Sequence, residues 1–469
     1  MPSSTVDLQL VIGLGRSGVG AARLLRAQGA EVWLLDQHQT PQLEQRAAQL
    51  RDEGIHVVLG CPLETSCLAA LPALPSAVVV SPGLRWDHPL LDQLRQQGIP
   101  VQGELVPAWR AGQQVPWIGI TGTNGKTTVT HLVSHLLCSQ GLDAPMGGNV
   151  GNSAAELVLR RCLSADPAPQ WLVMELSSYQ IEAAAEVAPR IGIWTTLTPD
   201  HLERHGSLEA YRAIKRGLLE RSGLQILNAD DPDLRTHANG WTQACWVTAR
   251  SRQELPDGLD PTLWIEANQV WHQPASGTAQ ALMRADCLAM PGAHNRQNML
   301  MAVAAGLAAG LDGPQMEAGL ASFPGVPHRL ERLPSRNGIT YFNDSKATNY
   351  DAAKVALEAL EGPLVVLAGG EAKQGDANGW IDQLKRQSRA VVLFGAAQQQ
   401  FQHLLQAAGY KGTIRTTPSL QEAVTVAAEL AATLGCRAVL LSPACASFDQ
   451  YSDFEARGEH FRALVAALA

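Results

Sequence analysis

Short apolar runs alternate with stretches of helical periodicity through the first hundred residues. The runs that predict strands are Leu8–Ile12, Glu31–Asp36, His56–Leu59 and Ala77–Val80. Between the first two, Gly13–Gly18 predicts a turn and Val19–Gln28 a helix. Strands that alternate with helices favour a parallel sheet covered on both faces.

The same alternation returns twice further along the chain. The strands expected there are Trp117–Thr121, Trp171–Leu176, Ile191–Thr196, Leu364–Ala368, Ala390–Phe394 and Ala438–Ser442. Helices are expected at Lys126–Gln140 and Leu208–Glu220, and the turn-rich stretch Pro256–Leu288 predicts a small antiparallel appendage. Phe323–Pro327, with two prolines and a glycine, predicts a linker. We therefore expect an α/β protein of three domains, at residues 1–104, 105–325 and 326–469.

Composition narrows the class of protein. Apolar residues make up 46% of the 469 positions and charged residues 17%, which is enough to form buried cores. The net charge of −8 provides no general attraction for nucleic acid. The longest uncharged apolar run, Met299–Leu311, is too short to span a bilayer, and no basic–apolar leader precedes the first strand. The eight cysteines include no Cys-x-x-Cys pair, so we expect a reduced cytoplasmic protein without membrane insertion.

A glycine pattern lies between the first predicted strand and helix. Gly13, Gly15 and Gly18 permit a tight turn, and a diphosphate can then approach the helix N-terminus. Asp36, at the end of the next strand, is placed to accept a hydrogen bond from a ribose hydroxyl. The alternatives are a compact turn without a ligand and a nicotinamide dehydrogenase. The pattern indicates a nucleotide diphosphate without specifying which one.

A second glycine-rich loop, Thr121–Thr128, follows a strand and opens a helix. Its amides can surround phosphate oxygens, Lys126 can reach the β–γ bridge, and the Thr127 hydroxyl can bind Mg²⁺. The loop is a variant, because Ile120 stands where the first glycine of the common pattern belongs. Glu175 ends a neighbouring predicted strand and suggests a Mg²⁺ ligand; a helix-capping role is the alternative.

Lysine is rare in this chain, with 7 residues against 29 arginines, so its positions carry information. Lys215 lies on a predicted helix, fourteen residues after His201, which follows another strand. A primary amine can react with CO₂ to form a carbamate, which supplies oxygen ligands. The alternatives are a structural histidine and an ordinary solvated lysine.

Several polar segments follow predicted strands later in the chain. Asn295 and Asn298 share one face of a helix and could bind a purine edge, with capping as the alternative for one of them. The remaining candidates are Arg329, Asp344, Lys346, Thr348, Lys373 and Ser447. Each follows or precedes a predicted strand at an edge where ligands collect, and an ordinary polar loop is the alternative.

The order of these motifs resembles the Mur ligase family from Val11 to about Arg462. The resemblance rests on Thr121–Thr128, Glu175–Gln180, His294–Asn298 and Asn343–Asn349. The segment Leu441–Gln450, followed by Phe454 and Arg457-Gly458, is similar to the members of that family that add D-glutamate. The resemblance implies an N-terminal Rossmann-like UDP-binding domain, a central P-loop ATPase-like domain with a mostly parallel sheet, and a C-terminal Rossmann-like domain.

The resemblance also implies a role for each candidate residue. The UDP-substrate would contact Gly15, Arg16, Ser17, Asp36, Ser81, Pro82, Gly83, Asn149 and His201. ATP would contact Gly122, Thr123, Asn124, Gly125, Lys126, Thr127, Thr128, Asn295, Asn298, Arg329 and Asp344. Thr127 and Glu175 would hold one Mg²⁺ ion, and Glu175, His201 and carbamylated Lys215 a second. D-Glutamate would contact Lys346, Thr348, Lys373, Ser447 and Phe454, while Lys126, Glu175, His201 and Lys215 would act in catalysis.

The implied reaction is an ATP-dependent ligation in cytoplasmic peptidoglycan precursor synthesis. The alanine carboxylate of UDP-N-acetylmuramoyl-L-alanine would attack the γ-phosphate, and the amine of D-glutamate would then displace phosphate from the acyl phosphate. ADP and phosphate would leave, and the enzyme would act as a monomer. Another Mur step, folylpolyglutamate synthesis and a non-catalytic nucleotide-binding regulator are the alternatives.

Overall fold

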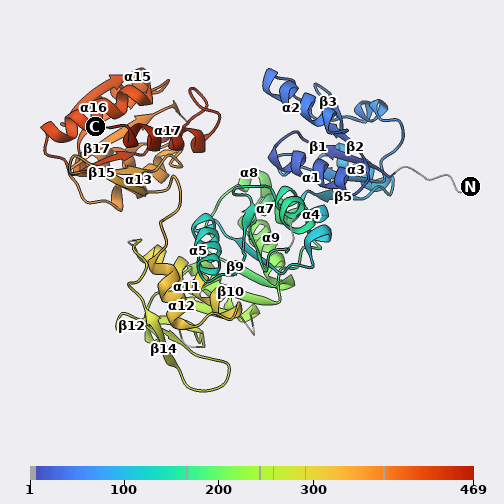
Figure 1. Cartoon of the computed structure of the whole chain (residues 1–469), viewed down its shortest axis with the longest axis horizontal. Coiled ribbons are helices and arrows are strands. Elements are labelled where there is room, and N and C mark those ends of the chain that lie inside the picture. Colours follow the sequence, from blue (N-terminus) through green and yellow to red (C-terminus); the bar gives the residue numbers. More distant parts are fainter. Residues whose placement is uncertain are drawn as a thin grey trace, which may run out of the picture. The chain divides into compact units, whose positions relative to one another are not determined.

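The computed structural model describes residues 7–164, 167–241, 244–256, 258–290, 292–372 and 375–468. The chain divides into two units, and the boundary between them falls after Phe323, inside the predicted linker (Figure 1). Each unit is described by itself below. No helix among the described residues is long and apolar enough to cross a membrane.

The first unit begins with a parallel sheet of strand order β3-β2-β1-β4-β5. Its elements are β1 (Leu8–Ile12), α1 (Arg16–Ala27), β2 (Glu31–Leu35), α2 (Pro41–Asp52), β3 (His56–Val58), η1 (Thr65–Ala70), β4 (Ala77–Val80), α3 (Pro89–Gln96) and β5 (Val101–Gly103). Alternate side chains of β1 enter two different cores, Val11 on one face and Leu10 and Ile12 on the other. The predicted parallel sheet covered on both faces is confirmed.

Helix α1 begins earlier than the sequence pattern predicts. The expected turn reached Gly18, but the turn ends at Gly15, and Arg16 opens the helix. Gly13 makes the turn with a φ of +103°, and Gly18 packs against it within the first helical turn. A Cβ atom at Gly18 would lie 1.9 Å from the Gly13 carbonyl oxygen. Gly18 therefore permits close packing and does not make the turn.

A larger sheet of order β14-β13-β12-β11-β10-β9-β6-β8-β7 completes the first unit. Its strands are β6 (Trp117–Thr121), β7 (Met146–Gly148), β8 (Leu172–Glu175), β9 (Ile191–Trp194), β10 (Leu224–Asn228), β11 (Cys245–Thr248), β12 (Leu263–Glu266), β13 (Gln269–His272) and β14 (Gln280–Arg284). The helices are α4 (Leu105–Gly112), α5 (Lys126–Ser139), α6 (Ala154–Val158), η2 (Leu159–Leu163), α7 (Ser178–Glu182), α8 (Leu202–His205), α9 (Leu208–Arg221), α10 (Pro232–Thr236), η3 (Ala238–Gly240), η4 (Arg252–Glu254), α11 (Ala293–Ala308) and α12 (Gly313–Ala321). The strands from β7 to β12 pair in parallel.

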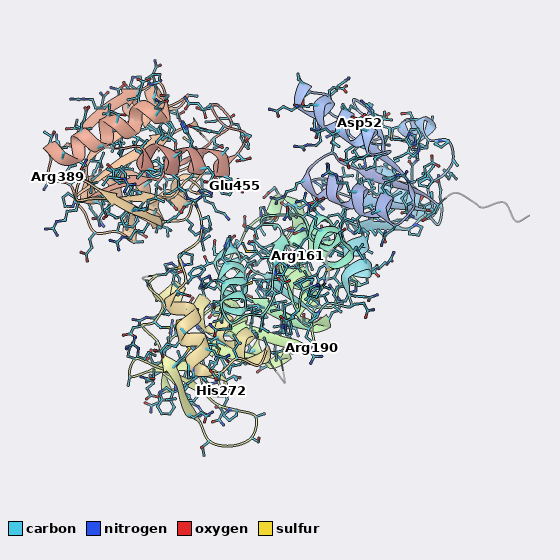
Figure 2. The ribbon with its side chains drawn as sticks, viewed as in Figure 1. Asp52, Arg161, Arg190, His272, Arg389 and Glu455 are labelled. Atoms are coloured by element: carbon cyan, nitrogen blue, oxygen red, sulfur yellow. The ribbon has the colours of Figure 1, made fainter. Side chains whose placement is uncertain are left out.

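The stretch predicted as a small antiparallel appendage extends the edge of this sheet. Strands β12, β13 and β14 pair antiparallel with one another, as expected. Val247 and Thr248 of β11 pair in parallel with Leu263 and Trp264 of β12, so the sheet continues into the hairpins. Figure 2 labels His272 at the end of β13 in this region. The antiparallel pairing is confirmed, and the structure adds that β11 offers backbone groups with which β12 pairs.

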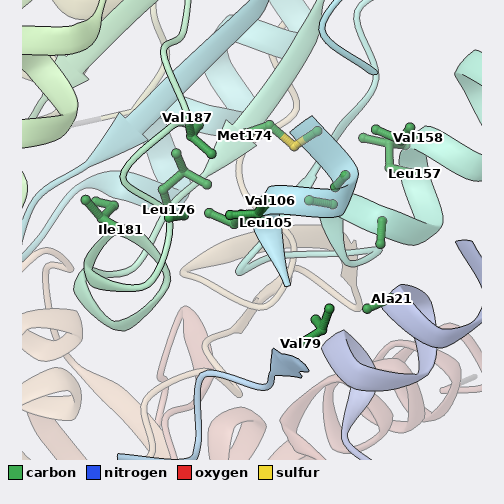
Figure 3. Packing of buried hydrophobic residues seen from close by; sticks show 14 of the residues in the cluster. Ala21, Val79, Leu105, Val106, Leu157, Val158, Met174, Leu176, Ile181 and Val187 are labelled. Atoms are coloured by element: carbon green, nitrogen blue, oxygen red, sulfur yellow. The ribbon is translucent and has the colours of Figure 1, made fainter. Parts of the chain in front are cut away.

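One hydrophobic core joins the two sheets of the first unit. It runs from Ala21 of α1 and Val79 of β4, through Leu105 and Val158, to Met174 of β8. Figure 3 labels these residues, with Leu105 in the centre of the view, Met174 above it and Val79 below it. The first sheet is therefore held against the second by apolar burial, the main stabilising force in folding.

The second unit is a six-stranded sheet of order β15-β16-β21-β17-β19-β20 with a small β18-β22 pair. Its elements are β15 (Glu331–Arg336), β16 (Ile339–Asn343), α13 (Tyr350–Glu358), β17 (Leu364–Gly369), β18 (Glu371–Ala372), α14 (Asn378–Gln387), β19 (Ser388–Phe394), α15 (Gln398–Ala407), β20 (Thr413–Thr417), α16 (Leu420–Thr433), β21 (Ala438–Leu441), β22 (Cys445–Ala446) and α17 (Phe454–Ala466). Strand β15 is antiparallel to β16, and the other neighbours pair in parallel. Val366 and Val365 of β17 enter different cores, so both faces are covered.

The order of this sheet brings three predicted polar segments to one edge. Strands β16, β21 and β17 are neighbours, and their carboxyl ends lead into the segments that begin at Asp344, Ser442 and Gly370. The Asp344 amide donates to the Leu441 carbonyl, and the Gly369 amide to the Pro443 carbonyl. The expectation that these segments share a strand edge is confirmed.

Candidate active site

The phosphate-loop candidate connects β6 to α5 and is held by residues that follow β9. Gly122 and Gly125 adopt φ values of +145° and +84°, which favour glycine. A Cβ atom at Gly122 would lie 2.0 Å from Thr195 Oγ1. The Thr196 hydroxyl accepts from the Asn124 amide at 2.9 Å. The glycines thus allow the loop to pack closely on the next strand.

Lys126 opens α5, and its side chain turns back over this loop. Its Nζ atom donates to the carbonyl oxygens of Gly122 and Thr123, each at 2.9 Å. Thr127 and Thr128, the next two residues, are buried in the first turn of the helix. The ammonium group therefore already lies beside the loop, at a helix N-terminus that favours anions.

Helix α11 brings the two predicted asparagines to the same loop. Asn298 Nδ2 donates to Asn295 Oδ1 at 3.4 Å, so the two side chains share a face as predicted. A Cβ atom at Gly125 would lie 2.8 Å from Asn298 Oδ1. Both asparagines are buried. Asn298 therefore lies next to the phosphate-loop candidate.

Glu175 ends β8, and in the sheet register it is opposite Ile120, at the end of β6. Its side chain is only 2% exposed. Asn149 Nδ2 donates to Oε1 at 2.9 Å. Oε2 is buried and has no hydrogen-bond donor within the described part of the chain. A buried carboxylate oxygen without a donor is unfavourable unless a cation or a water molecule reaches it.

Lys215 projects from α9 toward the same edge and is 1% exposed. Its Nζ atom donates to Thr121 Oγ1 at 3.2 Å and to the Gly122 carbonyl at 3.0 Å, and it lies 4.5 Å from the centre of the Tyr211 ring. Burial and the nearby Lys126 lower the pKa of Lys215 well below its ordinary value, while Asp200 opposes this. The structure therefore excludes the ordinary solvated lysine that the sequence alone left possible.

His201 lies at the start of α8 and is more exposed than the other candidates. Its backbone φ is +53°, and 45% of its side chain is accessible. Its ring packs 5.1 Å from the ring of Tyr179, and Nε2 lies 3.5 Å from an Asp200 oxygen. Among the described residues, no three His, Cys, Asp or Glu side chains converge on a metal position. A cation at this edge would need further ligands from substrate, water or a modified lysine.

The glycine turn after β1 forms a close contact with the turn after β4. Ser81 Oγ donates to the Gly13 carbonyl at 3.2 Å, and Leu84 N donates to the Ser81 carbonyl across Pro82 and Gly83. A Cβ atom at Gly15 would meet nothing within 4 Å. The space beside Gly15 is therefore open, as an approaching diphosphate requires.

Asp36 already holds the backbone of this turn. Its carboxylate accepts from the Leu14 amide at 2.7 Å and from the His38 amide at 2.9 Å. Arg16 reaches in the other direction and donates to the Asn149 carbonyl at 3.2 Å. Since Asn149 also binds Glu175, the turn and the β8 carboxylate are joined through one residue.

In the second unit, Asp344 is the most deeply buried of the candidate carboxylates. It accepts from Ser442 Oγ at 2.9 Å and from the Leu330 amide at 3.1 Å. Burial raises the pKa of Asp344 to about 7, and these two donors and Arg329 oppose the rise. Arg329 lies between His328 and Leu330, which both have positive φ values.

Among the described residues predicted to receive D-glutamate, Lys346 and Thr348 follow β16, Ser447 follows β22, and Phe454 opens α17. Lys346 Nζ lies 5.5 Å from the centre of the Phe454 ring, and the Thr348 amide donates to the Lys346 carbonyl. Ser447 is 2% exposed, and its carbonyl accepts from the amides of the next turn. Lys373 lies outside the described residues. The structure therefore brings Lys346 and Phe454 together and places Ser447 on a neighbouring segment.

Sequence reasoning missed two buried charged residues beside these groups. Glu104, which directly precedes α4, accepts from Gln180 Nε2 at 2.8 Å and has no motif that would mark it. Arg457 was noted only as part of a pattern, although its guanidinium is fully buried. Both act through partners distant in the sequence, which periodicity does not reveal.

Comparison with known proteins gives matches along nearly the whole chain. Family models match as the Mur ligase MurD-like N-terminal domain at residues 7–103, the Mur ligase middle domain at 120–306 and the Mur ligase glutamate ligase domain at 328–445. A protein of Parasynechococcus marenigrum named UDP-N-acetylmuramoylalanine–D-glutamate ligase is 56% identical over 456 residues, which is 97% of each chain. A protein of Synechocystis with the same name is 46% identical over 459 residues, covering 98% of this chain and 99% of the relative.

Solved structures agree with the fold. UDP-N-acetylmuramate-alanine ligase MurC from Thermotoga maritima superposes with a TM-score of 0.58 at 20% identity, covering 97% of this chain and 98% of that one. MurF from Acinetobacter baumannii gives 0.54 at 19% identity, covering 97% and 93%. These likenesses confirm the predicted three-domain α/β architecture with mostly parallel sheets.

Proposed function

The chain belongs to the Mur ligase family, and on that premise we propose that it joins D-glutamate to UDP-N-acetylmuramoyl-L-alanine with cleavage of ATP to ADP and phosphate. The observation that carries the proposal is the edge where Lys126, Glu175 and Lys215 surround a glycine loop. The name shared by relatives of 44–56% identity supports the choice of D-glutamate. The reaction belongs to peptidoglycan precursor synthesis, and we propose that a monomer carries it out in the cytoplasm.

The first step brings two anions together. An oxygen of the alanine carboxylate attacks the γ-phosphorus of ATP, the bond to the β–γ bridging oxygen breaks, and ADP leaves. Lys126 would exchange its two loop carbonyls for phosphate oxygens, and the amides of Gly122–Thr128 would hold the phosphates. Asn295 and Asn298, with Arg329 and Asp344 of the second unit, would complete the nucleotide contacts.

The buried carboxylate of Glu175 fits a divalent cation. Its Oε2 atom lacks a donor among the described residues, lies on the edge that carries the phosphate loop, and is a hard oxygen ligand. Glu175 and Thr127 would hold one Mg²⁺ ion, and Glu175, His201 and Lys215 a second. Bound Mg²⁺ would offset the charge that repels carboxylate from phosphate.

Lys215 can serve as such a ligand only after modification. A free ammonium would repel Mg²⁺, whereas the deprotonated amine can add to CO₂ and release a proton, and burial lowers the pKa of Lys215 in the direction that eases this deprotonation. The carbamate oxygens would then lie near Thr121 and Gly122, where Nζ lies now. The product is a carboxylate on a lysine stem, which removes the positive charge.

The second step is attack by the D-glutamate amine on the acyl-phosphate carbonyl, followed by loss of phosphate. Lys346, Thr348, Lys373, Ser447 and Phe454 would bind D-glutamate. Gly15, Arg16, Ser17, Asp36, Ser81, Pro82, Gly83, Asn149 and His201 would bind the UDP-substrate. Because Asp36 accepts from the Leu14 amide and Arg16 donates to the Asn149 carbonyl, these residues would act partly by fixing the shape of the binding turn.

Phosphate release tests the proposal directly. The purified enzyme is incubated with ATP, Mg²⁺ and UDP-N-acetylmuramoyl-L-alanine, together with D-glutamate, L-glutamate, L-lysine, diaminopimelate or D-alanyl-D-alanine. Release with D-glutamate alone is expected. Release with a different acceptor would keep the ligase chemistry and reject the acceptor, and no release with any acceptor would reject the ligase.

A further inference from the structure

The pair Arg457-Gly458 is the one part of the carboxyl-terminal pattern without an assigned role. Arg457 lies on α17, three residues after Phe454, and has no exposed surface. Figure 2 labels Glu455 on the same helix, which is the last in the chain. A fully buried guanidinium is costly unless its donors are satisfied, so its partners indicate its purpose.

The hydrogen bonds of Arg457 link two loops. Its Nε and Nη2 atoms donate to Oγ and the carbonyl of Ser345, at 3.0 and 2.8 Å. Nη2 also donates to the Cys445 carbonyl at 3.1 Å, and Nη1 to the Ala446 carbonyl at 3.2 Å. Each of these acceptors is neutral. Burial lowers the pKa of Arg457 to about 10, so the group still carries its charge at neutral pH.

Two of the three bonded residues directly adjoin a group proposed to bind D-glutamate. Ser345 precedes Lys346, and Ala446 precedes Ser447. The Ser345 hydroxyl also donates to the Phe454 carbonyl at 2.9 Å, which ties the start of α17 to the same point. The guanidinium therefore lies where the three segments meet.

The same bonds extend to the segment that leads to Lys373. Cys445 and Ala446 form β22, which pairs antiparallel with Ala372 and Glu371 of β18. A Cβ atom at Gly370, just before β18, would lie 3.1 Å from Arg457 Nη1. Arg457 thus packs directly against the backbone that turns into β18.

We propose that Arg457 is the positioning residue that fixes the D-glutamate site by holding these segments in one relative arrangement. The inference rests on the function proposed above. Arginine suits the task because its planar group presents several donors at fixed angles, whereas lysine has a single nitrogen. Substrate does not need to touch Arg457 for this effect.

A role confined to stability would give a different pattern of effects. Asp344 of the proposed nucleotide site adjoins Ser345, so general loosening of this unit would weaken ATP and D-glutamate binding alike. A positioning role predicts that the D-glutamate step is impaired while acyl phosphate still forms. Acyl-phosphate formation can be measured alone, as positional isotope exchange in ¹⁸O-labelled ATP with the UDP-substrate and without an amino acid.

The test compares Arg457→Lys with Arg462→Lys, a conservative change on the same helix at an arginine that forms ion pairs with Glu331 and Glu459. We expect Arg457→Lys to raise the KM for D-glutamate at least about tenfold, as the loss of bonds from a charged donor implies. The KM for ATP and the isotope exchange should stay near wild type. Arg462→Lys should leave all these values unchanged.

Ser345→Ala provides a second variant in case Arg457→Lys fails to fold. It removes the hydroxyl that joins Arg457 to Phe454 and should raise the KM for D-glutamate by a smaller factor. An unchanged KM for D-glutamate in both folded variants, or equal losses in KM and isotope exchange, would overturn the inference. A wild-type enzyme that accepts a different amino acid would instead refute the proposed acceptor, and the KM comparison would then be made with that amino acid.

Discussion

Burial leaves the carboxyl group of Glu104 partly protonated near neutral pH. Its side chain is 1% exposed, and its hydrogen-bonding partners are the uncharged side chains of Gln180 and Ser17. Burial raises the pKa of Glu104 from an ordinary 4.5 to about 7, and the two donors only partly oppose this. The replacement Glu104→Gln keeps the shape and remains neutral at every pH.

The size of the effect of Glu104 on the free energy of unfolding follows from the linkage between protonation and folding. Because the folded pKa lies above the unfolded one, the protonated carboxyl contributes stability that is complete below about pH 4.5 and is lost as the pH rises through about 7. The shift corresponds to about 3 kcal/mol, at about 1.4 kcal/mol for each tenfold change in proton affinity. Most of this, roughly 2 to 3 kcal/mol, should develop between pH 5 and pH 8.

The assay is urea unfolding of wild type and Glu104→Gln, followed by tryptophan fluorescence from pH 5 to pH 8. We expect the free energy of unfolding of the variant to rise relative to that of wild type as the pH increases, by roughly 2 to 3 kcal/mol across this range. Glu53→Gln is the control. The guanidinium of Arg23 lowers the pKa of Glu53, so that carboxylate stays ionised. The difference in free energy of unfolding between wild type and Glu53→Gln should therefore not vary with pH. If the free energies of unfolding of wild type and Glu104→Gln changed with pH in parallel, the reasoning would be refuted.

Three further predictions concern the candidate site. Gly18→Ala should lower the melting temperature by several degrees, because the added Cβ would lie 1.9 Å from a carbonyl oxygen. Gly15→Ala should have the melting temperature of wild type and should raise the KM for the UDP-substrate. Lys126→Ala should keep its fold, as seen by circular dichroism, and lose at least about a hundredfold in kcat; a smaller loss would exclude Lys126 from phosphate binding. Lys215→Ala should lose most activity, and acetate should restore part of it; full activity without acetate would remove Lys215 from the site.

The sequence was most informative where function depends on local order. The phosphate loop, Lys126 and Glu175 follow apolar strands, so their common edge could be predicted from alternating strands and helices. The same reasoning placed Asp344 and Ser442 at one edge, where they form a hydrogen bond. The start of α1 was set by packing of Gly18 against a backbone carbonyl, which spacing does not encode.

Long-range partners account for most of what the sequence did not reveal. Arg457 binds Ser345, 112 positions away, and Glu104 binds Gln180, 76 positions away. Such pairs depend on how separate elements pack, and a single sequence gives no signal for them. Asp36 was predicted to receive a ribose, but its bond to the Leu14 amide appears only once the turn is folded.

The continuous core beneath the first two sheets limits how chains of this kind can be recombined. A chimera joined at residue 104 would take Val79 from one parent and Leu105 and Val158 from the other, although all three belong to one apolar cluster. The two halves of that cluster would then have to match in shape as closely as the halves of an obligate dimer interface. A junction after Phe323 falls at the boundary between the two units, and both apolar clusters described for the second unit lie entirely beyond it. We therefore expect relatives to tolerate exchange of their acceptor-binding modules at a junction after Phe323, and not at a junction at residue 104.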